Sequence, residues 1–467
     1  MTTKLNLILI SVAYFIYAFF LSNYLLITSV GLTFSLYISL LFLFKLGKEI
    51  PLIELIILIA CFQWIVGAKI GYNIGKVHYK YYMYVEEVTY MNYVVPGVIL
   101  FYLGLSVFNL KILKNDLENY FDSYRESLTK VAKVILLIGL SSFFLSALVK
   151  IPQISFVFYL ANLLIYVGAA HYMLLFPKRR NAIFAVAMLF MFLNSLQTGF
   201  FHDLIISAVF LVFFLFSTET GYFRKLTIIT VGFSALYVLQ VVKSEYRSII
   251  WKSQGNVSAV AAFFEVLEEE FAPGNEAVNT VNLKTDAEAK DQNNINTRLN
   301  QGWIISKIMD NVPRNEDFLG GETITEAIKS SILPRFLFPN KKGAEQALIN
   351  FRQISGIDLN KGTSMGLSVI GEFYGNYGVN GGWVAMFLYG LFLSQAIKYL
   401  VYGLGKGSPL MLLWFILFFF QVVKAETDFI KIINHLVKSI VFFALFLFLM
   451  KAINVNILMQ ANTDEGE

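Results

Sequence analysis

The amino-acid sequence predicts an all-α, polytopic membrane protein with about 12 transmembrane helices and one long external helical loop. Of its 467 residues, 57% are hydrophobic and 15% are charged. Soluble domains carry about a quarter of charged residues, so this composition indicates that the bilayer is the solvent for most of the chain. One long polar stretch, residues 243–363, interrupts the apolar runs. An insertion of that length is uncommon unless it works outside lipid.

Twelve apolar runs approach the roughly 20 residues that a helix needs to cross a bilayer. They are 5–22, 24–44, 52–70, 91–109, 131–149, 154–176, 181–197, 203–217, 226–242, 380–402, 409–425 and 436–452. Only Ser22 and Asn23 separate the first two, which predicts a tight hairpin. No small-residue cleavage site follows the first run, which predicts a retained helix and not a signal peptide.

Lys and Arg residues gather in alternate loops, and this bias predicts the orientation of the chain. The basic loop residues are Lys45, Lys48, Lys111, Lys114, Arg125, Lys130, Lys178, Arg179, Arg180, Arg224, Lys225 and Lys406. If these loops are cytoplasmic, both ends of the chain are cytoplasmic and the long loop is outside. The chain then divides into N-terminal transmembrane helices (1–242), an external periplasmic loop (243–363), a glycine-rich shoulder with C-terminal transmembrane helices (364–452) and a cytoplasmic tail (453–467).

The external loop shows helical periodicity in several places. Apolar residues recur at helical spacing in 257–271, 298–312 and 344–355. Thr323 and Glu326 have the spacing of a capping box, which predicts that a further helix begins there. We therefore expect a few amphipathic helices that lie over the membrane and not an independent domain.

Two polar features lie in shorter outside loops, and each has two interpretations. Residues 71–90 are rich in tyrosine, which is typical of an aromatic belt at lipid headgroups but also of a surface that stacks on sugar rings. His202 and Asp203 form either an acid–base pair or a solvated turn.

Two basic motifs belong to the long loop. Lys243 and Arg247 lie four residues apart, with Tyr246 between them, so the two cations share one helix face and suit a pyrophosphate. The alternative is that they reach toward lipid phosphates. Pro334 and Pro339 fix the backbone around Arg335, and the basic pair Lys341 and Lys342 follows. This pattern predicts either a rigid turn that faces an anion or a solvated loop.

Two acidic candidates follow the loop. Glu372 stands among glycines at the edge of the membrane, where an ionisable residue indicates function unless it only pairs with an Arg across a helix-packing seam. Asp428 lies in a charged segment that begins at Lys424, and this segment is either the location of a general base or a salt-bridged turn.

Other kinds of chemistry have no support in the sequence. Cys61 is the single cysteine, which excludes an internal disulfide framework and a Cys-based metal site. No Walker loop, dinucleotide fingerprint or HExxH motif is present. We therefore predict no cofactor and no metal, and the net charge of +5 gives no reason to expect nucleic acid as a partner.

These motifs resemble those of Wzy-type O-antigen and capsule repeat-unit polymerases. The resemblance rests on Lys243, Tyr246 and Arg247; on Pro334, Arg335, Pro339 and Lys341; and on Ser364, Gly366, Glu372, Gly375 and Gly378. It covers roughly 239–382 in motif and the whole chain in layout. An Arg followed by ten residues and a Gly is described for some members, but nine residues separate Arg352 from Gly362 here.

The resemblance implies a glycosyltransferase of the bacterial inner membrane that joins undecaprenyl-pyrophosphate-linked oligosaccharides into O-antigen or capsule. It implies Glu372 or Asp428 as the base, and a chain-length regulator and a flippase as partners. The expected substrate-binding residues are Lys243, Tyr246, Arg247, Arg298, Arg335, Lys341 and Arg352.

Two other functions remain open at this stage. An O-antigen ligase shares the layout, but the resemblance implies a histidine in its outer loop, and no histidine lies between Lys243 and Thr363. A lipid-linked oligosaccharide flippase is the second alternative, although transporters usually show internal repeats and this chain shows none that we detect.

Overall fold

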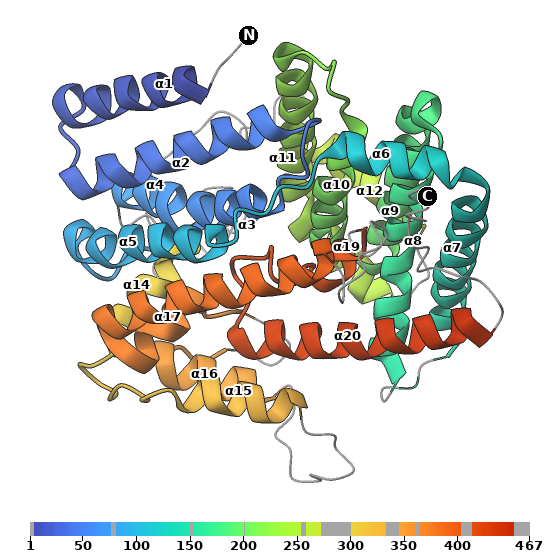
Figure 1. Ribbon diagram of the computed structural model, residues 1–467. Coiled ribbons are helices and arrows are strands. Elements are labelled where there is room, and N and C mark those ends of the chain that lie inside the picture. Colours follow the sequence, from blue (N-terminus) through green and yellow to red (C-terminus); the bar gives the residue numbers. More distant parts are fainter. Residues whose placement is uncertain are drawn as a thin grey trace, which may run out of the picture.

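The computed structural model describes residues 4–75, 81–149, 151, 154–199, 201–253, 258–271, 300–332, 345–359, 365–402 and 413–452. Every regular element within these ranges is a helix, which confirms the all-α class (Figure 1). Nine helices in the described part of the chain are long and apolar enough to cross a membrane. The protein is therefore a polytopic membrane protein, while the predicted number of about 12 spans is not confirmed by the described residues.

The long helices follow the predicted runs closely in the first half of the chain. The elements are α1 (Lys4–Ile16), α2 (Leu26–Lys45), α3 (Leu52–Ala60), α4 (Gly67–Ile74), α5 (Glu87–Ser106), α7 (Arg125–Leu148), α8 (Ser155–Leu175), α9 (Arg180–Thr198), α10 (His202–Leu215), α11 (Tyr222–Ser253), α17 (Val369–Tyr402) and α20 (Phe429–Ala452). A π-helical segment, Cys61–Val66, joins α3 to α4 so that they form one span. At 14 residues, α10 is apolar but shorter than any of the nine candidate spans in the described part of the chain.

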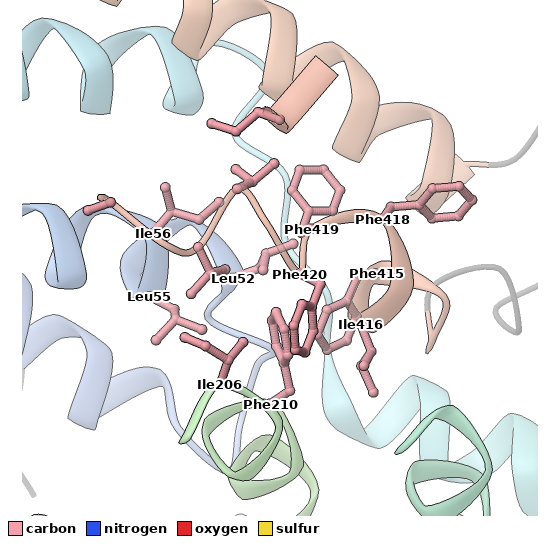
Figure 2. Close-up of a cluster of buried hydrophobic side chains, with 14 of the residues drawn as sticks. Leu52, Leu55, Ile56, Ile206, Phe210, Phe415, Ile416, Phe418, Phe419 and Phe420 are labelled. Atoms are coloured by element: carbon pink, nitrogen blue, oxygen red, sulfur yellow. The ribbon is translucent and has the colours of Figure 1, made fainter. Parts of the chain in front are cut away.

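The predicted span 409–425 is wrong in the part that the structure describes, from residue 413 onward. The one helix there is the single turn α19 (Phe415–Phe418), after which the chain turns irregularly. Figure 2 shows aromatic residues of this segment against Leu52, Leu55 and Ile56 of α3 and against α10. The Phe210 ring of α10 lies 5.3 Å from that of Phe415. Irregular backbone is tolerated at membrane depth when protein surrounds it, so a segment that is apolar on all sides need not be a spanning helix.

The glycine-rich shoulder also differs from the prediction, because it is already helical. The helix α17 begins at Val369 and not at 380, and it is broken at Gly378, whose φ of 68° is left-handed. The rings of Phe373 and Phe429 both contact that of Tyr389, at 6.1 and 6.0 Å. At 1.5 Å per helical residue, Tyr389 lies roughly 15 Å beyond the break. The first turns of α17 and α20 therefore meet within the bundle and not at its rim.

The shorter helices include four in the long polar stretch, where amphipathic helices are predicted. They are α6 (Lys114–Ser123), α12 (Ala259–Phe271), α14 (Gly302–Asn311), α15 (Glu322–Ile332) and α16 (Glu345–Ser355). Figure 1 shows α14, α15 and α16 together beside the start of α17. The helix predicted to begin near Thr323 is present as α15, but Thr323 does not cap it, because Thr323 lies inside α15 and the side-chain amide of Asn376 donates to its hydroxyl at 2.8 Å. The Thr323 hydroxyl oxygen therefore makes a tertiary hydrogen bond to Asn376 instead of capping the helix.

Several loops with predicted cytoplasmic cations meet at one place, which we call the basic end (Lys45, Lys114, Arg180 and Lys225). The Lys225 ammonium donates to the carbonyl of Leu46, and Lys114 donates to carbonyls at the end of α10, including that of Phe214. Arg180 pairs with Glu118 at 3.2 Å. These contacts hold the loops together at one end of the protein.

The helices α5 and α17 cross with their backbones in contact. A Cβ added at Gly390 would lie 2.4 Å from the Phe101 carbonyl oxygen, and one added at Gly104 would lie 2.3 Å from the Phe387 carbonyl oxygen. We expect Gly390→Ala to destabilise the protein by about 1–3 kcal/mol, because the two helices must move apart. The measurement is the fraction of solubilised protein that stays monodisperse after heating.

Gly232→Ala is the matched control, since nothing lies within 4 Å of the added Cβ on α11. It should be neutral or should stabilise by up to about 1 kcal/mol through helix propensity. Equal thermal behaviour of the two variants would show that the crossing does not depend on close approach.

Candidate functional site

The segment between α19 and α20 carries a charged motif, Lys424–Asp428, which we call the polar turn. Because the preceding residues do not form a spanning helix, the polar turn lies within the protein. Lys424 is 9% exposed and Asp428 is 2% exposed. Buried charges require partners, and each of these side chains has one.

Glu372 and Asp428, the two predicted catalytic carboxylates, meet at the start of α20. Glu372 is 1% exposed, and one of its oxygens accepts the backbone N–H of Phe429 at 2.8 Å. Asp428 accepts the N–H of Leu367 and pairs with the Lys431 ammonium at 2.6 Å. Both carboxylates lie at the positive end of the α20 dipole, which stabilises negative charge. Burial raises the pKa of Asp428, and Lys431 opposes that effect.

Loop residues hold Glu372 in place from the other side. The Thr323 hydroxyl hydrogen bonds to Glu372. Asn376, one turn after Glu372 on α17, donates to Thr323 Oγ1 at 2.8 Å and accepts the N–H of Gly321 at 3.1 Å. The start of α15 is thereby fixed to the carboxylate.

Gly366 lies too close to the polar turn for a larger residue to fit. A Cβ at this position would lie 1.9 Å from the carbonyl oxygen of Glu426 and 3.2 Å from Asp428 Oδ1. The Gln301 side chain also donates to the Gly366 carbonyl at 2.9 Å. The segment before α17 therefore lies directly against the polar turn.

The other side of the polar turn faces α10 and α11. Lys424 pairs with Asp203 at 2.9 Å, and His202 lies 3.5 Å from Glu426. Lys243 is close enough to His202 to act on it electrostatically. His202 and Asp203 thus each contact a residue of the polar turn, while their side chains remain 34% and 43% exposed.

The predicted substrate-binding residues have different locations. Tyr246 is fully buried, and its hydroxyl donates to the Leu196 carbonyl. Its ring packs between those of Phe201 and Phe263, so in this structure Tyr246 is part of the protein core. Arg247 donates through Nε to the Gly199 carbonyl at 2.7 Å, which ties α11 to the end of α9.

Arg352 pairs at 2.6 Å with Asp358, and both side chains are more than 70% exposed. It lies on α16 and contacts neither carboxylate in the structure. Arg298, Arg335 and Lys341 lie outside the described residues.

The tyrosine-rich loop packs onto α14. The Tyr81 ring meets Trp303 edge-on at 5.0 Å, and Tyr82 stacks on Tyr84 at 4.1 Å. Lys307 lies over the Tyr84 ring at 4.5 Å. These rings are largely engaged within the protein, which favours neither a lipid belt nor a free sugar-stacking face for them.

The site also contains residues that are not predicted from the sequence to bind substrate or to act as a base, namely Gln301, Thr323, Asn376, Lys424 and Lys431. Two of them were accessible from spacing: Asn376 is four residues after Glu372, and Lys431 is three after Asp428, so each shares a helix face with its carboxylate. Among the described residues, no group of three or more His, Cys, Asp or Glu side chains is placed to hold a metal ion. The arrangement can accept a proton at the carboxylates and stabilise an anion at the lysines.

Comparison with known proteins gives one match. The family model described as a domain of unknown function, DUF8712, matches residues 10–460, so the chain belongs to this family. Neither the curated proteins nor the solved structures yield a match.

Proposed function

We propose that this DUF8712 member is a polymerase that joins undecaprenyl-pyrophosphate-linked oligosaccharide repeat units into a surface polysaccharide, O-antigen or capsule, at the outer face of the bacterial inner membrane. The observation that supports it best is the buried pair Glu372 and Asp428, which has the cation Lys424 nearby on the polar turn and the cation Lys431 in the first turn of α20. A protein within a bilayer buries such a cluster only at a cost of several kcal/mol, so function is the default interpretation.

The reaction needs a proton acceptor and a stabilised leaving group. A hydroxyl of the incoming unit attacks the anomeric carbon of the growing chain, the new glycosidic C–O bond forms, and the C–O bond to the pyrophosphate breaks. We assign the hydroxyl proton to Asp428, because Lys431, which covers its second oxygen, is 39% exposed and can move aside. Glu372 places a second carboxylate beside Asp428. Repulsion between the two negative charges raises the proton affinity of the pair, so the pair is a better proton acceptor.

The departing pyrophosphate needs cations. Lys424 and Lys243 lie on the α10 and α11 side of the polar turn, near His202. We assign them to the pyrophosphate. Tyr246 and Arg247 hold this end of α11 against α9 and so position Lys243.

The function is tested by the surface polysaccharide of a strain that lacks this protein, with the wild-type gene restored as control. If the protein is a polymerase, the strain that lacks it should carry caps of a single repeat unit on its surface. Long chains that remain on the lipid carrier would identify a ligase instead, and the loss of all surface sugar would identify a flippase.

The proposed orientation has its own test, which uses the fact that Cys61 is buried. We expect a membrane-impermeant maleimide to label Glu316→Cys in intact, outer-membrane-permeabilised cells, and to label Glu126→Cys only after lysis. Both side chains are exposed, so accessibility differs only by side of the membrane. Labelling of Glu126→Cys in intact cells would place the polar turn on the side where lipid-linked repeat units are not displayed.

A further inference from the structure

A polar cleft lies at the basic end, away from the carboxylate pair. Its volume is about 350 Å³, and it lies between the start of α9 and the connection from α10 to α11. The polar and charged residues that line it include Lys178, Arg180, Arg224, Ser217, Thr220 and Glu219. Three cations against one carboxylate give the cleft an excess of positive charge.

Two helices add to this positive character. The first residues of α9, Arg180 and Asn181, line the cleft, as does Arg224 near the start of α11. The N-terminal ends of two long helices therefore border it, and helix N-termini favour anions.

Arg180 has unused capacity to donate. Its Nε donates to the Pro177 carbonyl at 3.1 Å, and its Nη2 pairs with Glu118 at 3.2 Å. Its Nη1 is buried and has no hydrogen-bond partner within the described part of the chain. A buried guanidinium nitrogen without a partner is costly, and a phosphate oxygen is a suitable acceptor for it.

The exposed face of α11 indicates which molecule carries the phosphate. Phe223 is 84% exposed, Leu226 52% and Val231 63%, and these residues lead away from the cleft along α11. A soluble phosphate compound makes no use of such a face, whereas acyl chains do. We propose that the cleft binds the phosphate of an anionic membrane lipid, with its chains along α11.

The test measures lipid retained by the purified protein, by native mass spectrometry after addition of phosphatidylglycerol. Arg224→Gln and Lys178→Gln should each weaken retention about fivefold, since one cation near a lipid surface contributes about 1 kcal/mol. Arg179→Gln is the matched control, because Arg179 is an exposed neighbour that does not line the cleft. Each variant must first elute as a single peak with wild-type thermal stability.

Two further probes separate the sources of the phosphate. Diacylglycerol, which lacks the phosphate, should be retained much less than phosphatidylglycerol. Inorganic phosphate alone should bind weakly in equilibrium dialysis. Equal retention of the two lipids, an equal loss in Arg179→Gln, or tight binding of inorganic phosphate would each overturn the lipid site.

Discussion

Asp428→Asn is expected to reduce long-chain polysaccharide by about 100-fold or more, the contribution typical of a general base. Asparagine keeps an oxygen that can accept the Leu367 N–H, but it carries no charge and cannot take the proton. The substitution should destabilise the fold only slightly, because Lys431, which loses its partner, already reaches solvent. Glu372→Gln should act in the same direction, since glutamine can still accept from Phe429. The measurement is the polysaccharide ladder on a gel, with protein levels matched by blot.

Asp310→Asn is the matched control. Asp310 pairs with Lys307 at 2.9 Å and with the same i,i+3 spacing as Asp428 and Lys431, but it lies on α14 outside the proposed site. It should leave the ladder unchanged. A wild-type ladder from both Asp428→Asn and Glu372→Gln would reduce the carboxylate pair to a structural feature of the α20 N-terminus.

Gly366→Ala is expected to have a comparable effect without removing any charge. The added Cβ would lie 1.9 Å from the Glu426 carbonyl oxygen, far inside van der Waals contact, so the polar turn must shift by about an ångström. Misplacement of a catalytic group by that distance can reduce a rate by about 100-fold. We therefore expect loss of the long ladder while the protein remains inserted in the membrane.

Gly221→Ala provides the comparison, because nothing lies within 4 Å of its added Cβ. It should keep the full ladder. If Gly366→Ala also keeps the full ladder at matched protein level, the close contact between residue 366 and the polar turn is not required for activity.

The sequence alone determined the class of the protein and the amphipathic helices of the long polar stretch. Both follow from periodicity and run length, which are local properties of the chain. It also singled out Glu372, as a lone carboxylate among glycines at the edge of the membrane, and Asp428, as part of a charged segment between apolar runs.

Only the tertiary structure decided where these residues meet. Glu372 and Phe429 are 57 residues apart, and Lys424 and Asp203 are 221 apart, so no local pattern joins them. Hydropathy cannot tell lipid from a protein interior as the surroundings of Phe415 to Phe420, and for that reason the segment was predicted as a span. Tyr246 shows the same limit, because its motif suits a ligand while packing between Phe201 and Phe263 assigns it to the core. Burial depends on which distant elements pack together, and the sequence encodes that only through the fold as a whole.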